Sequence, residues 1–166
     1  YVPERPILYE YYTLWEHIDL LIRTLGQDEN ELKNRAKELC RVFRLNDKLY
    51  EYPIHFSKGM QQKVMLILAL TPKYDLYILD EPFMGLDPQA IRKLIQLIEE
   101  YKSQGAAILM STHALDTAEK ICDSFICMHN GALLKQGSLQ ELQRYPGQAL
   151  LEIFDELIEG EVHDVV

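Results

Sequence analysis

The sequence predicts an α/β fold in which a mostly parallel sheet is covered by helices and is preceded by a block made of helices alone. Between residues 73 and 137, short apolar runs alternate with amphipathic segments, which is the pattern of strand-helix-strand units. Residues 13–71 instead show apolar residues at helical spacing, which predicts the helical block. We therefore expect three parts, over residues 1–72, 73–137 and 138–166.

Composition and charge limit the classes of protein that remain. The chain has 166 residues, enough for one domain with a sizeable core. Its 17 Lys and Arg against 26 Asp and Glu give a formal net charge of -9, so we expect no nucleic-acid partner. No apolar run approaches the ~20 residues that span a bilayer, so any membrane role is expected to be peripheral. The cysteines lack C-x-x-C spacing and are expected to be reduced, structural thiols of a cytoplasmic protein: Cys40, Cys122 and Cys127.

Capping residues predict where the helices of the first block begin and end. Thr13-Leu14-Trp15-Glu16 has the S/T-x-x-E pattern of a capping box, and Gly26 closes that helix. Asp28 and Ser57 begin the next two helices. The predicted helices cover residues 13–25, 28–43 and 57–71, with a loop over residues 46–56.

A change of period marks the α/β part. The run Leu76-Tyr77-Ile78-Leu79 is short and continuous, which predicts a strand buried on both faces. Asp87 and Pro88 supply an N-cap and a proline at the first position of a helix that stops near Gly105. Next we expect a buried strand over residues 106–110 and a helix over 114–122. A strand over 125–128 should form a hairpin with 132–135 through Asn130-Gly131. A capping box at 138–141 should begin two short helices.

Two carboxylates directly follow the first predicted strand, at the end where α/β sheets place their ligands. In nucleotide hydrolases the first of two such acids, here Asp80, can hold Mg²⁺, and the second, Glu81, can orient the attacking water. The alternative is a strand that simply ends in solvated acids. Asp87 has an ordinary interpretation as a helix N-cap, and it can serve both purposes.

A histidine and a helix start supply further candidate groups. His113 ends the next predicted strand, so it lies beside the carboxylates if the two strands are neighbours, where it can contact a developing phosphate charge. The alternative is a structural histidine. The segment Phe56-Ser57-Lys58-Gly59-Met60-Gln61 opens a helix whose N–H groups and dipole make an anion site, or else it is an ordinary cap.

Taken in order, these motifs resemble the ATP-binding subunit of ABC transporters from Tyr1 to about Leu157. Within the family, the segments Phe56 to Met60 and Leu79 to Asp87 look most like those of bacterial ABC-2-type or Ecs-type ATPases. Tyr1 to Glu4 resembles the Q-loop, and Phe56 to Gln61 resembles the L-S-G-G-Q signature. Leu76 to Glu81 resembles Walker B, Gly85 to Asp87 resembles the D-loop, and His113 resembles the switch histidine.

The resemblance implies a partial P-loop NTPase (RecA-like) parallel sheet with helices and an inserted α-helical subdomain. The implied activity is hydrolysis of ATP with Mg²⁺: Asp80 would hold the metal through water, Glu81 would polarise the hydrolytic water, and His113 would contact the γ-phosphate. Glu4, at the position that senses the metal, is a further candidate ligand. The implied nucleotide-binding residues are Glu4, Ser57, Lys58, Gly59, Met60, Gln61 and Asp87.

The same resemblance implies two partners. A second copy of the domain would close head to tail around two ATP molecules, with Ser57 and Gly59 facing the partner's nucleotide. An integral membrane permease would dock near Tyr9, Tyr11, Tyr12 and Trp15, which places the protein in the cytoplasm on the inner face of the cell membrane. The alternative for these rings is the core of the helical block. Alternative functions are a soluble ABC-type ATPase acting on ribosomes or DNA, and a non-catalytic interaction module.

Three departures from the family pattern stand out. Lys58 replaces the first glycine of the signature and Met60 replaces its glutamine, while Glu4 replaces the glutamine of the Q-loop. No G-x-x-x-x-G-K-[ST] pattern occurs, so the Walker A phosphate cradle is missing from these residues. We therefore expect the intact protein to carry it upstream of Tyr1, and we expect the chain alone to be inactive.

Overall fold

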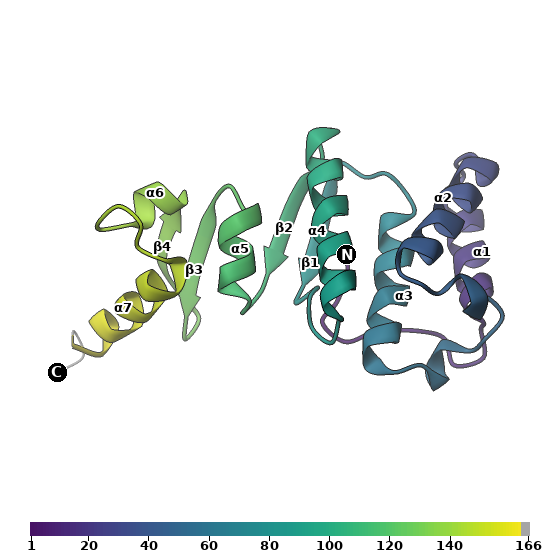
Figure 1. Cartoon of the computed structure of the whole chain (residues 1–166), viewed down its shortest axis with the longest axis horizontal. Helices are drawn as coiled ribbons and strands as arrows, with labels where there is room; N and C mark the ends of the chain where they lie inside the picture. Colours follow the sequence, from purple (N-terminus) through teal and green to yellow (C-terminus); the bar gives the residue numbers. More distant parts are fainter. Residues whose placement is uncertain (164–166) are drawn as a thin grey trace. The chain divides into compact units, whose positions relative to one another are not determined.

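The computed structural model describes residues 1–163, with side chains described as far as residue 160. The chain divides into two compact units, Tyr1–Thr112 and His113–Val166. Each unit has its own secondary structure and its own buried side chains, and the elements are labelled in Figure 1. In the part of the chain that the structure covers, no helix has the length and apolar character needed to cross a membrane.

The first unit begins with the helical block that the sequence predicts. Helix α1 spans Leu14–Leu25, α2 spans Glu29–Val42 and α3 spans Lys58–Leu70, and each packs on the other two (Figure 1). The predicted loop between α2 and α3 contains two short 3-10 helices, Asn46–Lys48 and Pro53–His55. The three predicted α-helices are therefore confirmed. Their buried apolar side chains include Leu14, Ile18, Ile22, Leu32, Ala36, Leu39, Val64, Ile67 and Leu70.

The predicted caps account for the helix bounds. Thr13 and Glu16 form the capping box, in which the Glu16 N–H donates to Thr13 Oγ1 at 3.3 Å and the Thr13 N–H donates to Glu16 Oε2 at 2.7 Å. Gly26 ends α1 in the left-handed region with φ of 63°. The Asp28 carboxylate accepts from two N–H groups at the start of α2. Local hydrogen bonds that the sequence specifies thus set these ends.

A pair of parallel strands follows the helical block. Strand β1 spans Leu76–Asp80 and β2 spans Ala107–Ser111, and helix α4, Pro88–Ser103, connects them. The register places Leu79 opposite Met110. Val2 adds a bridge on the other edge of β1: its N–H donates to the Ile78 carbonyl, and its carbonyl accepts from the Asp80 N–H, both at 2.8 Å.

The prediction that the strands of this pair are buried on both faces is wrong. Tyr77 and Leu79 of β1 are buried, whereas Leu76 is 52% exposed and Ile78 is 38% exposed. Strand β2 alternates in the same way, with Leu109 52% exposed. The reason is that successive residues of a strand point to opposite faces, and among the described residues a helix covers only one face of this pair. The buried face packs against α4, where the Tyr77 ring stacks on Tyr101 with centroids 5.0 Å apart.

The end of α3 is tied to α2 and α4 through a single carbonyl group. The Leu70 carbonyl accepts from the Tyr101 hydroxyl at 2.8 Å and from Arg35 Nε at 3.1 Å. The Arg35 guanidinium also bonds the Tyr101 hydroxyl and lies over its ring, 5.0 Å from the centroid. This cluster joins the helical block to the helix that covers the strands.

The second unit is built around an antiparallel hairpin. Strands β3, Phe125–His129, and β4, Ala132–Gly137, pair through the predicted turn, where Asn130 and Gly131 have φ of 46° and 80°. Its helices are α5, Leu115–Ile121, α6, Leu139–Leu142, and α7, Leu150–His163. The predicted hairpin and the capping box of Ser138 and Glu141 are confirmed, but α7 is longer than the short helix expected.

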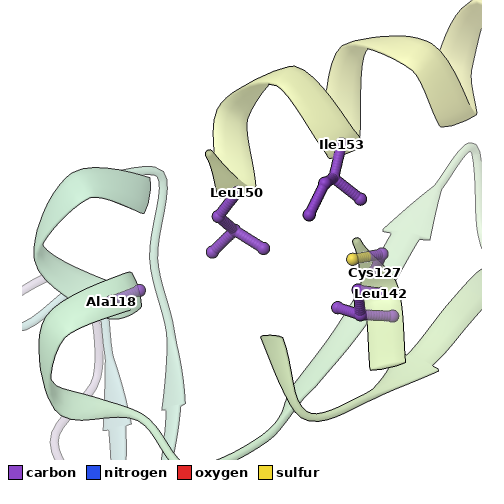
Figure 2. Close-up of a cluster of buried hydrophobic side chains, with 5 residues drawn as sticks. All are labelled: Ala118, Cys127, Leu142, Leu150 and Ile153. Carbon is purple, nitrogen blue, oxygen red and sulfur yellow. The ribbon is translucent and has the colours of Figure 1, made fainter. Parts of the chain in front are cut away.

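The core of the second unit contains side chains from the hairpin, from the helix that precedes it in the chain and from the two helices that follow it. Figure 2 shows Ala118 of α5, Cys127 of β3, and Leu142, Leu150 and Ile153 from the C-terminal helices. The described strands form two two-stranded sheets, β1 with β2 and β3 with β4, instead of one mostly parallel sheet. The turn at residues 130 and 131 pairs β3 with β4, and the two sheets belong to different compact units.

Candidate functional site

The two predicted acids lie at the carboxyl end of β1, as expected. Asp80 is the last residue of the strand and is half-buried. Its Oδ1 accepts a hydrogen bond from the Ser111 hydroxyl, and the Tyr1 hydroxyl donates to its Oδ2 at 3.4 Å. Because β1 and β2 are parallel neighbours with Asp80 opposite Ser111, the carboxyl ends of both strands meet at this edge.

Glu81 has an unusual backbone conformation. Its φ is 45°, in the left-handed region that residues other than glycine seldom occupy. The Glu81 N–H donates to the Ser111 carbonyl at 3.0 Å, and its Oε2 accepts from the Thr112 hydroxyl at 3.4 Å. The backbone therefore turns away from the strand at this residue while β2 continues to hold it. Conformations of this kind often occur at functional sites.

The residues before α1 are brought to the same edge of the strands. Val2 pairs in parallel with β1 beside Leu79, so the chain leaves Val2 towards the carboxyl end of that strand. Glu4 follows two residues later and is exposed. Carboxylate, hydroxyl and water oxygens are the ligands that Mg²⁺ prefers, and Asp80 and Glu4 fit this preference. Among the residues that the structure describes, no three His, Cys, Asp or Glu side chains gather into a metal-binding group.

The signature-like segment forms the first turn of α3. Ser57 is the N-cap, and its hydroxyl accepts from the Met60 N–H at 3.3 Å. Lys58 is exposed, and the first turn of the helix contains no acidic residue. The Gln61 side chain points back to its own loop, where it donates to the Pro53 carbonyl at 2.9 Å. The ordinary cap is thus present, and it leaves the positive end of the helix dipole without a charged neighbour of opposite sign on its first turn.

The turn after β1 contacts this first turn of α3 directly. A Cβ placed at Gly59 would overlap the carbonyl oxygen of Gly85, so the two backbones touch. Gly85 itself has φ of 73°, which favours glycine. The structure therefore brings together two segments that lie more than 20 residues apart and that both resemble nucleotide-contacting motifs.

Asp87 has two partners at once. Its Oδ1 accepts from the N–H groups of Gln89 and Ala90 at 3.0 and 2.9 Å, which confirms the predicted N-cap of α4. Its Oδ2 lies 2.6 Å from Lys63 Nζ of α3. The Lys63 ammonium and the capped N–H groups lower the pKa of Asp87 to about 2.

His113 is the first residue of the second unit, and the aromatic cluster lies at and before the start of α1. Strand β2 ends at Ser111, so His113 follows it by two residues, at the start of the second unit, and is exposed. Tyr9, Tyr11 and Tyr12 are 61%, 85% and 39% exposed, which contradicts the alternative that places them in the core. Trp15 is half-buried, with Lys37 Nζ 5.4 Å from its ring centroid.

A buried histidine holds part of the aromatic cluster in place. His17 Nε2 accepts from the Tyr9 N–H at 2.9 Å, and its Nδ1 lies 2.8 Å from the Thr13 carbonyl. The rings of Tyr9 and Tyr12 pack on each other with centroids 5.1 Å apart, and both lie within 6 Å of the His17 ring.

Sequence reasoning missed three residues that contact the predicted site. Ser111 and Thr112 come immediately before His113, and their position at the end of the neighbouring strand could have identified them. Lys63 carries no comparable signal, because its partner Asp87 lies 24 residues away in the chain. Only the packing of α3 on the turn after β1 reveals it.

Two carboxylates at the end of a parallel strand, the start of α3 against the turn that follows them and α4 packed on the strand pair are features of an α/β protein with a phosphate-binding strand edge. A family model described as "AAA domain, putative AbiEii toxin, Type IV TA system" matches residues 5–115. The chain is 46% identical over 164 residues to an uncharacterized ABC transporter ATP-binding protein, YthP, of Bacillus subtilis, and 46% identical over 160 residues to the ABC-type transporter ATP-binding protein EcsA of the same organism. The chain belongs to the ABC transporter ATP-binding proteins.

These matches cover nearly all of the chain but not all of the relatives. They take in 97% of this chain and 70% of YthP, and 95% of this chain and 65% of EcsA. A solved structure titled "Structure of ATP binding subunit of ABC transporter" superposes with a TM-score of 0.91 at 47% identity, over 95% of this chain and 67% of that one. The predicted family and its likeness to Ecs-type proteins are confirmed.

Proposed function

We propose that this chain is part of a subunit that binds and hydrolyses ATP to power an ABC membrane transporter. The observation that carries the proposal is the pair of carboxylates, Asp80 and Glu81, at the carboxyl end of β1, with hydroxyl groups at the end of the neighbouring strand, Ser111 and Thr112, bonded to them. This edge is where α/β proteins hold phosphates and the metal that accompanies them. The family membership supports the same activity.

The two acids have different tasks in this proposal. Asp80 is the carboxylate that holds Mg²⁺ through water, and Glu4 is a second oxygen ligand from the segment beside β1. Magnesium neutralises charge on the phosphates when it is bound. Glu81 orients and polarises the attacking water, and its turned backbone lets the carboxylate project from the strand end. His113, which follows Ser111 and Thr112, contacts the γ-phosphate.

The first turn of α3 and the turn after β1 serve a second copy of the chain. The N–H groups and the helix dipole at Ser57, Lys58 and Gly59 suit an anion, and the adjoining Met60, Gln61 and Asp87 complete this face. Two copies arranged head to tail would each offer it to the nucleotide held by the other. The bulky Lys58, in place of a glycine, is exposed and free to turn towards solvent.

A membrane permease is the proposed partner of the aromatic residues at and before the start of α1. The exposed rings of Tyr9, Tyr11 and Tyr12, with the half-buried Trp15, offer apolar contact area with polar tips, as docking surfaces for helices do. This partner would hold the subunit at the inner face of the cell membrane. The proposed parts are residues 1–72 for the Q-loop and helical subdomain, 73–137 for the catalytic core and 138–166 for the C-terminal helices.

The phosphate cradle is proposed to come from outside these residues, because they contain no G-x-x-x-x-G-K-[ST] pattern. We therefore expect the 166-residue chain to bind Mg·ATP too weakly to detect, and the full-length protein to bind it. Titration calorimetry on both, with the same Mg²⁺ concentration, tests this. Micromolar binding by the short chain would overturn the statement about the cradle. No binding or hydrolysis by the full-length protein would overturn the proposed function and favour an interaction module.

A further inference from the structure

We propose that Lys63 is a positioning residue that locks the first two turns of α3 to the turn formed by Gly85 and Asp87, so that these segments meet a nucleotide as one body. The inference rests on the proposed function for its consequence in ATP use. The link itself rests on the contacts between the two segments. Lys63 is not part of the predicted nucleotide-binding set.

The ion pair differs from an ordinary surface pair. Lys63 Nζ lies 2.6 Å from Asp87 Oδ2, and the Lys63 side chain is only 13% exposed. The Asp87 side chain is 50% exposed, so one partner of the pair is largely buried and the other is open to water. A cation on a largely buried side chain needs a close partner of opposite charge. Arg44 and Lys93 line the same small cavity of about 70 Å³ as this pair, so other cations reach the region, yet Lys63 is the one that contacts the carboxylate.

Asp87 converts this pair into a link between two helices. One carboxylate oxygen binds Lys63 of α3 while the other caps α4 through Gln89 and Ala90. The carboxylate is therefore held on both sides and has little freedom to reorient. A movement of α3 at this level has to be followed by the start of α4.

A second contact lies one helical turn away. Gly59 and Lys63 are four residues apart in α3, so they lie on the same face of the helix. Gly59 touches the Gly85 carbonyl, and Lys63 binds Asp87, two residues further along the turn. Two contacts, one through the backbone and one through charge, prevent the segments from pivoting about either one alone.

The link is tested by amide hydrogen exchange on the full-length protein without nucleotide. Lys63→Met keeps most of the aliphatic stem and removes the charge. In this variant we expect the exchange rate to rise about tenfold, a typical coupling between two sites. The rise should occur in both segments, at the amides of Met60 and Gln61 in α3 and at those of Gln89 and Ala90 in α4. Lys93→Met is the matched control, since Lys93 lines the same cavity and bonds Gln96 instead; it should leave all four amides unchanged. A rise confined to one segment, or no rise, would overturn the link.

The positioning role is tested by ATP hydrolysis with the same proteins. We expect Lys63→Met to raise the KM for ATP by about tenfold with kcat changed less than about twofold, because the segments must be aligned before nucleotide binds. Lys63→Arg, which restores a cation, should bring KM back close to the wild-type value. A loss in kcat alone, or equal KM values in Lys63→Met and wild type, would overturn the positioning role. A wild-type protein that does not hydrolyse ATP would overturn the proposed function and with it this role, while the exchange result still decides the link.

Discussion

Gly59 in α3 and Gly85 in the turn after β1 are in backbone contact, with the Gly59 α-carbon against the Gly85 carbonyl oxygen. No side chain fits between them. The contact explains why the first turn of α3 keeps this glycine even though its neighbour Lys58 departs from the family pattern. It also makes Gly59 a sensitive position for substitution.

Gly59→Ala should destabilise the protein by about 1–3 kcal/mol, as overpacking does, because the added methyl group has to displace a backbone carbonyl. Urea unfolding of wild type and variant measures the change. Gly160→Ala is the control, since Gly160 also lies in a helix, and a Cβ there meets no atom within 4 Å. The control should be neutral or slightly stabilising; equal effects at the two positions would contradict the contact.

Tyr101→Phe should lower the free energy of unfolding by about 1–2 kcal/mol, because it removes a buried hydroxyl that bonds the Leu70 carbonyl. Leu70 keeps its bond from Arg35 Nε, which limits the loss. Tyr145→Phe removes an exposed hydroxyl that donates to Glu152 and should change stability by less than about 0.5 kcal/mol. The same unfolding experiment compares the two. A neutral Tyr101→Phe would show that the cluster around Leu70 adds nothing to stability.

Stability should fall at alkaline pH through Tyr101. Burial raises the pKa of Tyr101 to about 12 from its ordinary value of 10.0, so above pH 10 the unfolded chain loses this proton before the folded chain does. The contribution of the neutral hydroxyl is therefore fully present below pH 10 and is lost as the pH rises towards 12. The free energy of unfolding, measured from pH 10 to pH 12, should decline less steeply in Tyr101→Phe than in wild type. Burial also raises the pKa of Cys40 to about 11, so both proteins share a loss from that thiol.

Glu81→Gln in the full-length protein should abolish ATP turnover while nucleotide remains bound, because the amide fits the same space but cannot act as a base. Turnover by phosphate release and retention of labelled ATP measure the two effects. Glu99→Gln, an exposed change on α4, is the control and should behave as wild type. Turnover of Glu81→Gln within a few-fold of wild type would exclude Glu81 as the base.

Lys58→Gly, in a Glu81→Gln background, should leave ATP-driven dimerisation unchanged or strengthen it. Lys58 is exposed, and an exposed cation gains little from a fixed geometry, whereas glycine allows a closer approach to phosphate. Dimer formation at two salt concentrations measures the effect. A loss of dimerisation that is sensitive to salt would show instead that the ammonium group contacts the nucleotide.

The features that sequence could predict are those formed within a few residues of one another. Thr13, Ser57 and Asp87 each accept bonds from N–H groups two or three residues ahead, so the starts of α1, α3 and α4 could be located from the chain alone. Asp80 and Glu81 end an apolar run, which placed them at a strand end. Whether that strand is covered on one face or two depends on other elements, and Ile78 shows that the run itself does not decide it.

Contacts between distant segments could not be predicted in this way. Lys63 and Asp87 meet because α3 packs on the turn after β1, and nothing in their spacing indicates it. Arg35 and Tyr101 lie 66 residues apart and meet for the same reason. Both pairs depend on tertiary packing, which selects one partner among many charged and aromatic side chains of similar local character.

The anchoring of the Leu70 carbonyl by Tyr101 and Arg35 gives α3 a fixed far end. With Lys63, the sixth of its 13 residues, held by Asp87, α3 is fixed at two points seven residues apart, about 10 Å at the usual rise per residue. The part of α3 between these two points moves as one piece instead of bending. A displacement of α3 would therefore be passed to α4 at both points, through Asp87 at its start and through Tyr101 near its end, and to α2 through Arg35.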